Sequence, residues 1–190
     1  MLEAKNVKCG NLVDVDSNLN NVYQHLEALR ELQTQTLYLR STTAQYMGAN
    51  SSYNQITFTN SITNFSTSAL SFNSADSTIN VDPSVYTDFK INLSMQFYAG
   101  SNNPDSTKTI YIRIKEIDAN GNEAVQQVPF FREAIGNVTS DGLRVISFGQ
   151  LLAFRDTTKK IKLEATTNGT TAPSINSIHF DITGITRSMN

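Results

Sequence analysis

The feature that most constrains this fold is a strict alternation of apolar and polar side chains in the second half of the chain. Four segments show it, namely Lys90–Phe97, Thr109–Lys115, Lys160–Ala165 and Ser177–Ile182. Successive side chains of a β-strand point to opposite faces, so each segment has one dry face and one wet face. Antiparallel sheets packed face to face have this property, whereas strands of parallel sheets read as continuous apolar runs. The alternation predicts an antiparallel β-sandwich.

Turn-forming residues divide the sequence at intervals that suit such a sandwich. Asn120-Gly121 lies between two strand-like runs and is a strong hairpin signal, because both residues tolerate positive φ. Other breaks fall at residues 100–105, 137–142 and 168–173. This spacing predicts a mainly β, jelly-roll-like body of about eight to ten strands.

A different period marks the N-terminal part, which has apolar residues at alternating spacings of three and four: Leu12, Val15, Leu19, Val22, Leu26 and Leu29. A stripe that repeats every 3.5 residues stays buried only when helices supercoil around each other. We therefore expect a short α-helical coiled coil over residues 12–40 whose six apolar residues mediate oligomerisation. Leu at a with Val at d favours three or more helices. An amphipathic helix packed on the sheet of the same chain is the alternative.

These periods predict four parts: a short segment at residues 1–11, the helix at 12–40, a polar linker at 41–52 and the β-sandwich at 53–190. Tyr38, Tyr46 and Tyr53 fall near the boundary between helix and body, where we expect them to pack together.

Charge and composition exclude several classes of function. Fifteen Lys and Arg against seventeen Asp and Glu give a net charge of −2, which is unsuited to sequence-independent nucleic-acid binding. Residues 1–10 contain no secretory apolar run, and no stretch is long enough to cross a membrane. Cys9 is the only cysteine, so no internal disulfide forms. Asn, Ser and Thr make up about a third of the chain, and such neutral polar surfaces suit particle-surface proteins.

Candidate catalytic residues are few. His25 falls in the predicted helix, and His179 falls on the polar face of its strand with Asp181 two residues further on. A metal site needs more convergent ligands than this pair offers. Residues Asp118 to Glu123 resemble a calcium loop, but the glycine is at the fourth position, and a hairpin turn explains them. We expect no catalytic residues, no cofactor and no metal, and therefore a protein that is not an enzyme.

The heptad residues Leu12 to Leu29, followed by an Asn/Ser/Thr-rich β-domain with strands at Lys90–Phe97, Thr109–Lys115 and Ser177–Ile182, resemble bacteriophage fibre, head-decoration and tail-knob proteins. The body is similar to the trimeric jelly-roll knobs of the tumour-necrosis-factor and complement-globular-head type. The resemblance implies a homotrimeric virion protein, made in the host cytoplasm, in which residues 1–11 attach to other capsid or tail proteins. The β-knob would then face outwards for decoration or host attachment.

Two other hypotheses remain open at this point. The body could be a carbohydrate-binding adhesin module that contacts host surface glycans through the loops Gly100–Asp105 and Asn168–Pro173. A hydrolase that acts on surface polysaccharide is the third hypothesis.

Overall fold

The computed structural model describes residues 19–24, 34–64, 67–98, 109–126, 131–134 and 143–186. The chain divides into two compact units, one comprising Met1–Gln33 with Thr186–Asn190 and the other Thr34–Ile185. In the first unit, residues 19–24 are helical. In the described part of the chain, no helix is long and apolar enough to span a membrane.

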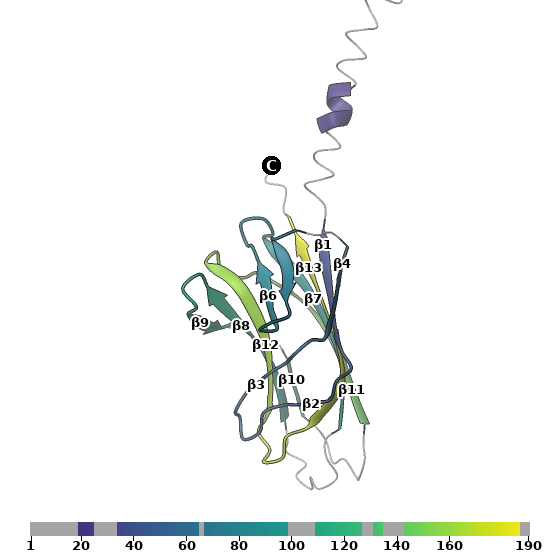
Figure 1. Cartoon of the computed structure of the whole chain (residues 1–190), viewed down its shortest axis with the longest axis vertical. Helices are drawn as coiled ribbons and strands as arrows, with labels where there is room; N and C mark the ends of the chain where they lie inside the picture. Colours follow the sequence, from purple (N-terminus) through teal and green to yellow (C-terminus); the bar gives the residue numbers. More distant parts are fainter. Residues whose placement is uncertain are drawn as a thin grey trace, which may run out of the picture. The chain divides into compact units, whose positions relative to one another are not determined.

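The second unit is built from two antiparallel sheets (Figure 1). The six-stranded sheet has the order β11-β7-β13-β1-β4, and β2 pairs with β13. Its strands are β1 (Gln35–Ser41), β2 (Gln45–Tyr46), β4 (Asn60–Thr63), β7 (Asp88–Tyr98), β11 (Leu143–Leu152) and β13 (Ser174–Ile185).

The seven-stranded sheet has the order β10-β8-β12-β6-β5, with β3 paired to β12 and β9 paired to β8. Its strands are β3 (Asn54–Gln55), β5 (Leu70–Asn73), β6 (Thr78–Val81), β8 (Thr109–Asp118), β9 (Glu123–Val125), β10 (Phe131–Ala134) and β12 (Thr158–Thr167). The first strand, β1, pairs with the last, β13, so the two ends of this unit lie side by side in the six-stranded sheet.

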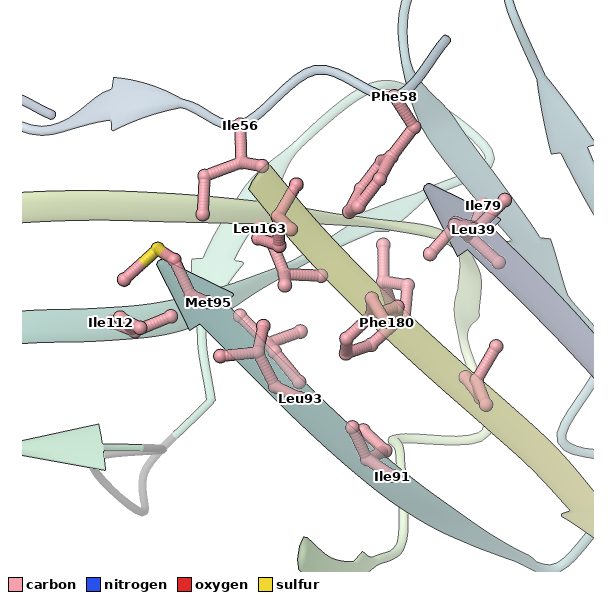
Figure 2. Close-up of a cluster of buried hydrophobic side chains, with 14 of the residues drawn as sticks. Leu39, Ile56, Phe58, Ile79, Ile91, Leu93, Met95, Ile112, Leu163 and Phe180 are labelled. Atoms are coloured by element: carbon pink, nitrogen blue, oxygen red, sulfur yellow. The ribbon is translucent and has the colours of Figure 1, made fainter. Parts of the chain in front are cut away.

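The alternating segments form the centre of both sheets, as the sequence predicts. In β7 the residues Phe89, Ile91, Leu93, Met95 and Phe97 are all buried, and the residues between them face outwards. The inward side chains of the two sheets meet in one apolar core (Figure 2). Burial of each large apolar side chain contributes about 1.5–3 kcal/mol. The expectation of a mainly β, antiparallel sandwich is confirmed.

The predicted helix at 12–40 is wrong over its last part, because residues Gln35–Ser41 form strand β1. Gln35, Leu37, Leu39 and Ser41 are buried in alternation with more exposed residues, which is the period of a strand and not of a helix. In the sequence, Leu32 and Leu39 suggest a heptad pattern that continues with a shift of three residues. Pairing with β13 on one side and β4 on the other gives these residues two hydrogen-bonded neighbours and an apolar core.

Gln35 shows how β1 is anchored. Its side chain is 1% exposed, and its Nε2 donates to the carbonyl of Leu70 at 2.7 Å. Its Oε1 accepts from the Tyr86 hydroxyl at 2.9 Å and from the Thr67 hydroxyl. These bonds satisfy a polar group that is costly to bury alone.

The predicted linker at 41–52 is also part of the sandwich. Strand β2 lies within it, and Met47 is 1% exposed in the core. Gly48 pairs with Thr166, and a Cβ at this position would lie 1.6 Å from the Ser52 carbonyl oxygen. The body therefore begins at Thr34 and not at residue 53.

The three tyrosines do not cluster as expected. Tyr38 and Tyr46 are exposed on the six-stranded sheet, with 44% and 65% of their surface accessible. The Tyr53 ring instead lies 3.6 Å from the Arg113 guanidinium carbon on the other sheet. Strand β1 carries Tyr38 away from Tyr53, and the alternation of the strand points its ring outwards.

Candidate functional site

Two of the six predicted oligomerisation residues lie in the described helix at 19–24. Leu19 and Val22 are three residues apart, so they share one side of the helix, and they are 48% and 53% exposed. Leu12, Val15, Leu26 and Leu29 lie outside the described residues, as does His25. The two described residues of the predicted coiled-coil seam, the line of apolar residues from Leu12 to Leu29, are therefore exposed in the single chain.

The face of the six-stranded sheet that points away from the core, here called the open face, carries a second candidate surface. On it, Arg40 of β1 is paired with Asn60 of β4 and with His179 of β13. In the next row, Tyr38 is paired with Ile62 of β4 and with Asp181 of β13. Directly paired residues have Cβ atoms about 4.5–5.5 Å apart, so these six side chains form one compact group.

This group lines a concavity of about 380 Å³. Burial raises the pKa of the Asp181 carboxyl, although the positive Arg40 and the neighbouring His179 act in the opposite direction. Among the described residues, the side chains of Tyr38, Arg40, His179 and Asp181 form no hydrogen bond and no ion pair. The concavity therefore presents donors and acceptors that form no hydrogen bond with other described residues.

The same two rows continue across the sheet. In the first row, His179 is paired with Ser94 of β7, and Ser94 is paired with Ser147 of β11. In the second row, Asp181 is paired with Asn92 of β7, and Asn92 is paired with Gly149 of β11. We call these ten positions the central strip: Asn60, Arg40, His179, Ser94, Ser147, Ile62, Tyr38, Asp181, Asn92 and Gly149. It crosses five strands, which at about 4.8 Å per strand makes it about 19 Å long.

One end of the open face is apolar. Tyr46 of β2, Tyr98 of β7 and Leu143 of β11 follow one another across the sheet, joined through Ser174 of β13. Val145 lies two residues beyond Leu143, and all four apolar side chains are between 41% and 65% exposed. We call these four residues the apolar patch.

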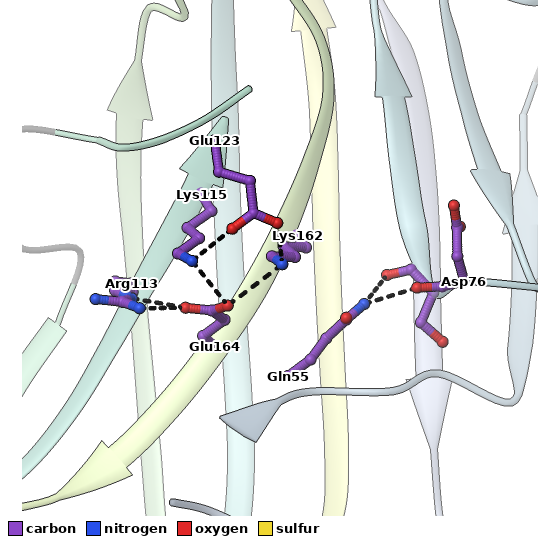
Figure 3. A network of polar contacts seen from close by, with 8 residues as sticks. Gln55, Asp76, Arg113, Lys115, Glu123, Lys162 and Glu164 are labelled. Carbon is purple, nitrogen blue, oxygen red and sulfur yellow. Dashed lines mark hydrogen bonds and ion pairs between the residues drawn. The ribbon is translucent and has the colours of Figure 1, made fainter. Parts of the chain in front are cut away.

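The outer face of the seven-stranded sheet carries an ion network instead (Figure 3). Lys115 and Lys162 are directly paired on β8 and β12, and their repulsion is relieved by Glu123, which lies 2.6 Å and 2.5 Å from the two amines. Glu164 binds Arg113 at 2.6 Å. The two lysines hold the pKa of Glu123 down at about 2. Because its five charges are paired with one another, this network stabilises the sheet and offers no site.

Three of the polar residues weighed for metal binding lie in the described part of the chain, namely Asp118, His179 and Asp181. His179 and Asp181 lie on the same outer face of β13. Asp118 closes the β8–β9 turn by accepting the amides of Asn120 and Asn122 at 2.8 and 2.9 Å, with Gly121 at φ 82°. No group of three potential metal-binding side chains occurs in the part of the chain that the structure describes.

Of the two loops predicted to contact glycans, only the one after β12 lies within the described residues. Residues 100–105 lie outside the described residues. In the loop after β12, the Asn168 side chain accepts the Thr109 amide at 2.7 Å and so holds the loop in place. Sequence reasoning does not find the central strip, because it predicts a helix at Tyr38 and Arg40, which lie in strand β1. The alternation of residues 35–41 was the signal that would have shown it.

No protein-family model matches the chain, and no curated protein matches its sequence. Similar solved structures include murine APRIL, with 10% identity and a TM-score of 0.51 over 80% of this chain and 100% of that one. The globular domain of zebrafish complement 1qA has 12% identity and a TM-score of 0.50 over 82% and 100%. Eiger TNF from S. frugiperda has 6% identity and a TM-score of 0.50 over 83% and 94%. The body therefore has a TNF-like jelly-roll fold, and at these identities the likeness concerns the fold alone.

Proposed function

We propose that this chain is a non-catalytic structural protein that forms homotrimers and displays its jelly-roll domain on the surface of a virus particle. Residues 1–11 would attach the trimer to other virion proteins.

The observation that carries the proposal is the exposure of Leu19 and Val22 on the helix at 19–24. Isolated short helices are marginally stable in water, and most of their stability comes from burying an apolar face. A seam that repeats every 3.5 residues is buried by supercoiling with further copies. Leu at a and Val at d support three copies over two.

The body supplies a second apolar surface in the apolar patch. A closed ring of three copies is held by heterologous contacts, in which one surface of a copy meets a different surface of the next. Contact of the apolar patch with a neighbouring body would remove Tyr46, Tyr98, Leu143 and Val145 from water. The TNF-like fold of the body agrees with the resemblance of the sequence to trimeric knobs. That resemblance is a further support for the proposed trimer.

The location on a virion rests on the order of parts in the sequence. A heptad segment followed by an Asn/Ser/Thr-rich β-domain resembles phage fibre and decoration proteins. Imaging of purified particles with an antibody fragment against the β-domain tests this location. Label at the particle surface supports it, and particles without label contradict it.

Sedimentation of the full chain tests assembly. The double variant Leu19→Asp with Leu26→Asp adds two charges at the seam, while Asn20→Asp with Gln24→Glu adds two charges away from it. We expect trimers for the wild type and for the second variant, and monomers or insoluble chain for the first. A monomeric wild type, or a seam variant that remains trimeric, would refute the proposal.

A further inference from the structure

Exposed apolar side chains of the body gather on the open face. Among the described residues of the body, nine large apolar side chains are between 41% and 65% exposed. Two of them lie elsewhere, Val85 in the loop before β7 and Val125 on β9. The other seven belong to the open face: Tyr38, Tyr46, Ile62, Tyr98, Leu143, Val145 and Leu151. Such a concentration on one face marks a contact with another protein chain.

Within the open face, most of these side chains lie at the two edges. At one edge are Tyr46 of β2 and Ile62 of β4. At the other edge, on β11, are Leu143, Val145 and Leu151. Between the edges, the central strip carries mostly polar side chains. Burial of apolar groups is favourable, whereas burial of polar groups without partners is costly. The pattern therefore favours contact of one edge with the opposite edge of a second copy.

The two edges match row by row. Tyr46 and Leu143 lie at opposite ends of one row of paired residues. Ile62 and Gly149 lie at opposite ends of another row, which belongs to the central strip. A rotation axis keeps every point at its own height along the axis. When the strands run along that axis, the two ends of a row are at equal height and can meet between copies.

The β11 edge has a low point at the place where Ile62 of a neighbour would arrive. Gly149 has no side chain, and a Cβ there would lie 2.7 Å from the side-chain oxygen of Asn92. The outward surface at this position is therefore formed by backbone and by the Asn92 amide. Leu151, two residues along the strand, is 56% exposed, and Ile62 is 65% exposed. A protruding Ile62 can thus approach the β11 backbone closely and pack beside Leu151.

We propose that the trimer closes by contact of the β2–β4 edge of one copy with the β11 edge of the next, with the strands of the six-stranded sheet running along the threefold axis. Tyr46 would pack against Leu143, and Ile62 would pack over Gly149 beside Leu151. The central strip then faces the axis, where its polar groups stay hydrated. This inference rests on the trimer proposed above and names the two surfaces that form its heterologous contact.

Disulfide formation between the edges tests this arrangement, because the same residues are far apart within one chain. Tyr46 and Leu143 are separated by three strand spacings, about 14 Å, and Ile62 and Leu151 by four, about 19 Å. A disulfide requires Cα atoms within about 7 Å of each other. Any disulfide across these pairs therefore joins two chains.

The test uses the full chain with Cys9→Ser, since Cys9 is the only cysteine. Two double variants, Tyr46→Cys with Leu143→Cys and Ile62→Cys with Leu151→Cys, are oxidised and run on denaturing gels without reductant. We expect both pairs to give covalent dimers and covalent trimers. Each of the four single variants should run as a monomer, because two copies of the same residue do not meet in a heterologous contact.

The matched control is Ile62→Cys with Val125→Cys, because Val125 is 43% exposed on β9 of the other sheet. This control should run as a monomer. Three results would overturn the proposal: a trimer in solution that forms no cross-link in one or both edge pairs, cross-links in a single variant, or equal cross-linking of the control.

Sedimentation of the reduced proteins reports on assembly separately. A trimeric wild type whose edge variants form no cross-link refutes only the edge contact, whereas a monomeric wild type refutes the trimer itself. Loss of the trimer in the reduced edge variants, with a reduced control that remains trimeric, supports the contact, because the replaced side chains then hold the copies together.

Discussion

Replacement of Leu39 by Ala tests the most consequential feature of the fold, the strand at residues 35–41. Leu39 is fully buried on β1 and is paired with Phe180 of β13 and Ser61 of β4. Neighbouring strands on both sides hold the backbone in place, so the site has little freedom to collapse. Leu→Ala changes at such positions cost about 2–5 kcal/mol, and we expect about 3 kcal/mol here.

Urea unfolding of the full chain measures this cost. With a slope near 2 kcal/mol per molar urea, about 3 kcal/mol lowers the midpoint by about 1.5 M. Arg40→Ala is the matched control, because Arg40 is the next residue on β1 and faces outwards, and its loss should cost less than about 0.5 kcal/mol. Both variants must be compared at one protein concentration, since assembly adds to apparent stability. Equal midpoints for Leu39→Ala and Arg40→Ala would refute the assignment of this segment to the sheet.

Two further variants probe packing and charge. Gly184→Ala should destabilise the body by about 1–3 kcal/mol in urea unfolding, because the added Cβ would lie 2.5 Å from the Tyr86 ring. An unchanged urea midpoint would contradict this close packing of Tyr86 on Gly184. Lys115 and Lys162 lower the pKa of Glu123 from 4.5 to about 2, so its contribution to stability is complete above pH 4.5 and is lost as the pH falls towards 2. The stability difference between wild type and Glu123→Gln should therefore shrink over that interval in urea unfolding at stepped pH, and a constant difference would contradict the ion network.

The core of the sandwich could be read from residue order because its strands have one wet and one dry face. Phe89 to Phe97 and Ser177 to Ile182 alternate without exception, and no helix can bury such a pattern on one side. The hairpin at Asn120-Gly121 is equally local, because Gly121 supplies the positive φ of 82° and Asp118 accepts the amides of Asn120 and Asn122.

The N-terminal boundary of the body was predicted wrongly for a physical reason. Leu32 and Leu39 are seven residues apart, so residues 34–41 fit both a heptad and an alternation. Which pattern applies depends on partners that are distant in sequence, namely β13 and the buried bonds of Gln35 to Leu70 and Tyr86. The same holds for Met47, whose amide donates to the Pro173 carbonyl, and for Gly48, which bonds to Ala165 and Thr167 of β12, because these partners are more than 110 residues away along the chain.

Residue order thus establishes the antiparallel strands, the polar neutral surface and the heptad spacing, since each depends on side chains close together along the chain. The pairing of β1 with β13, and with it the gathering of Tyr38, Arg40, His179 and Asp181 on one face, depends on strands about 140 residues apart. Cross-strand register places a side chain beside its neighbours, and register is set by closure of the whole sandwich around its core.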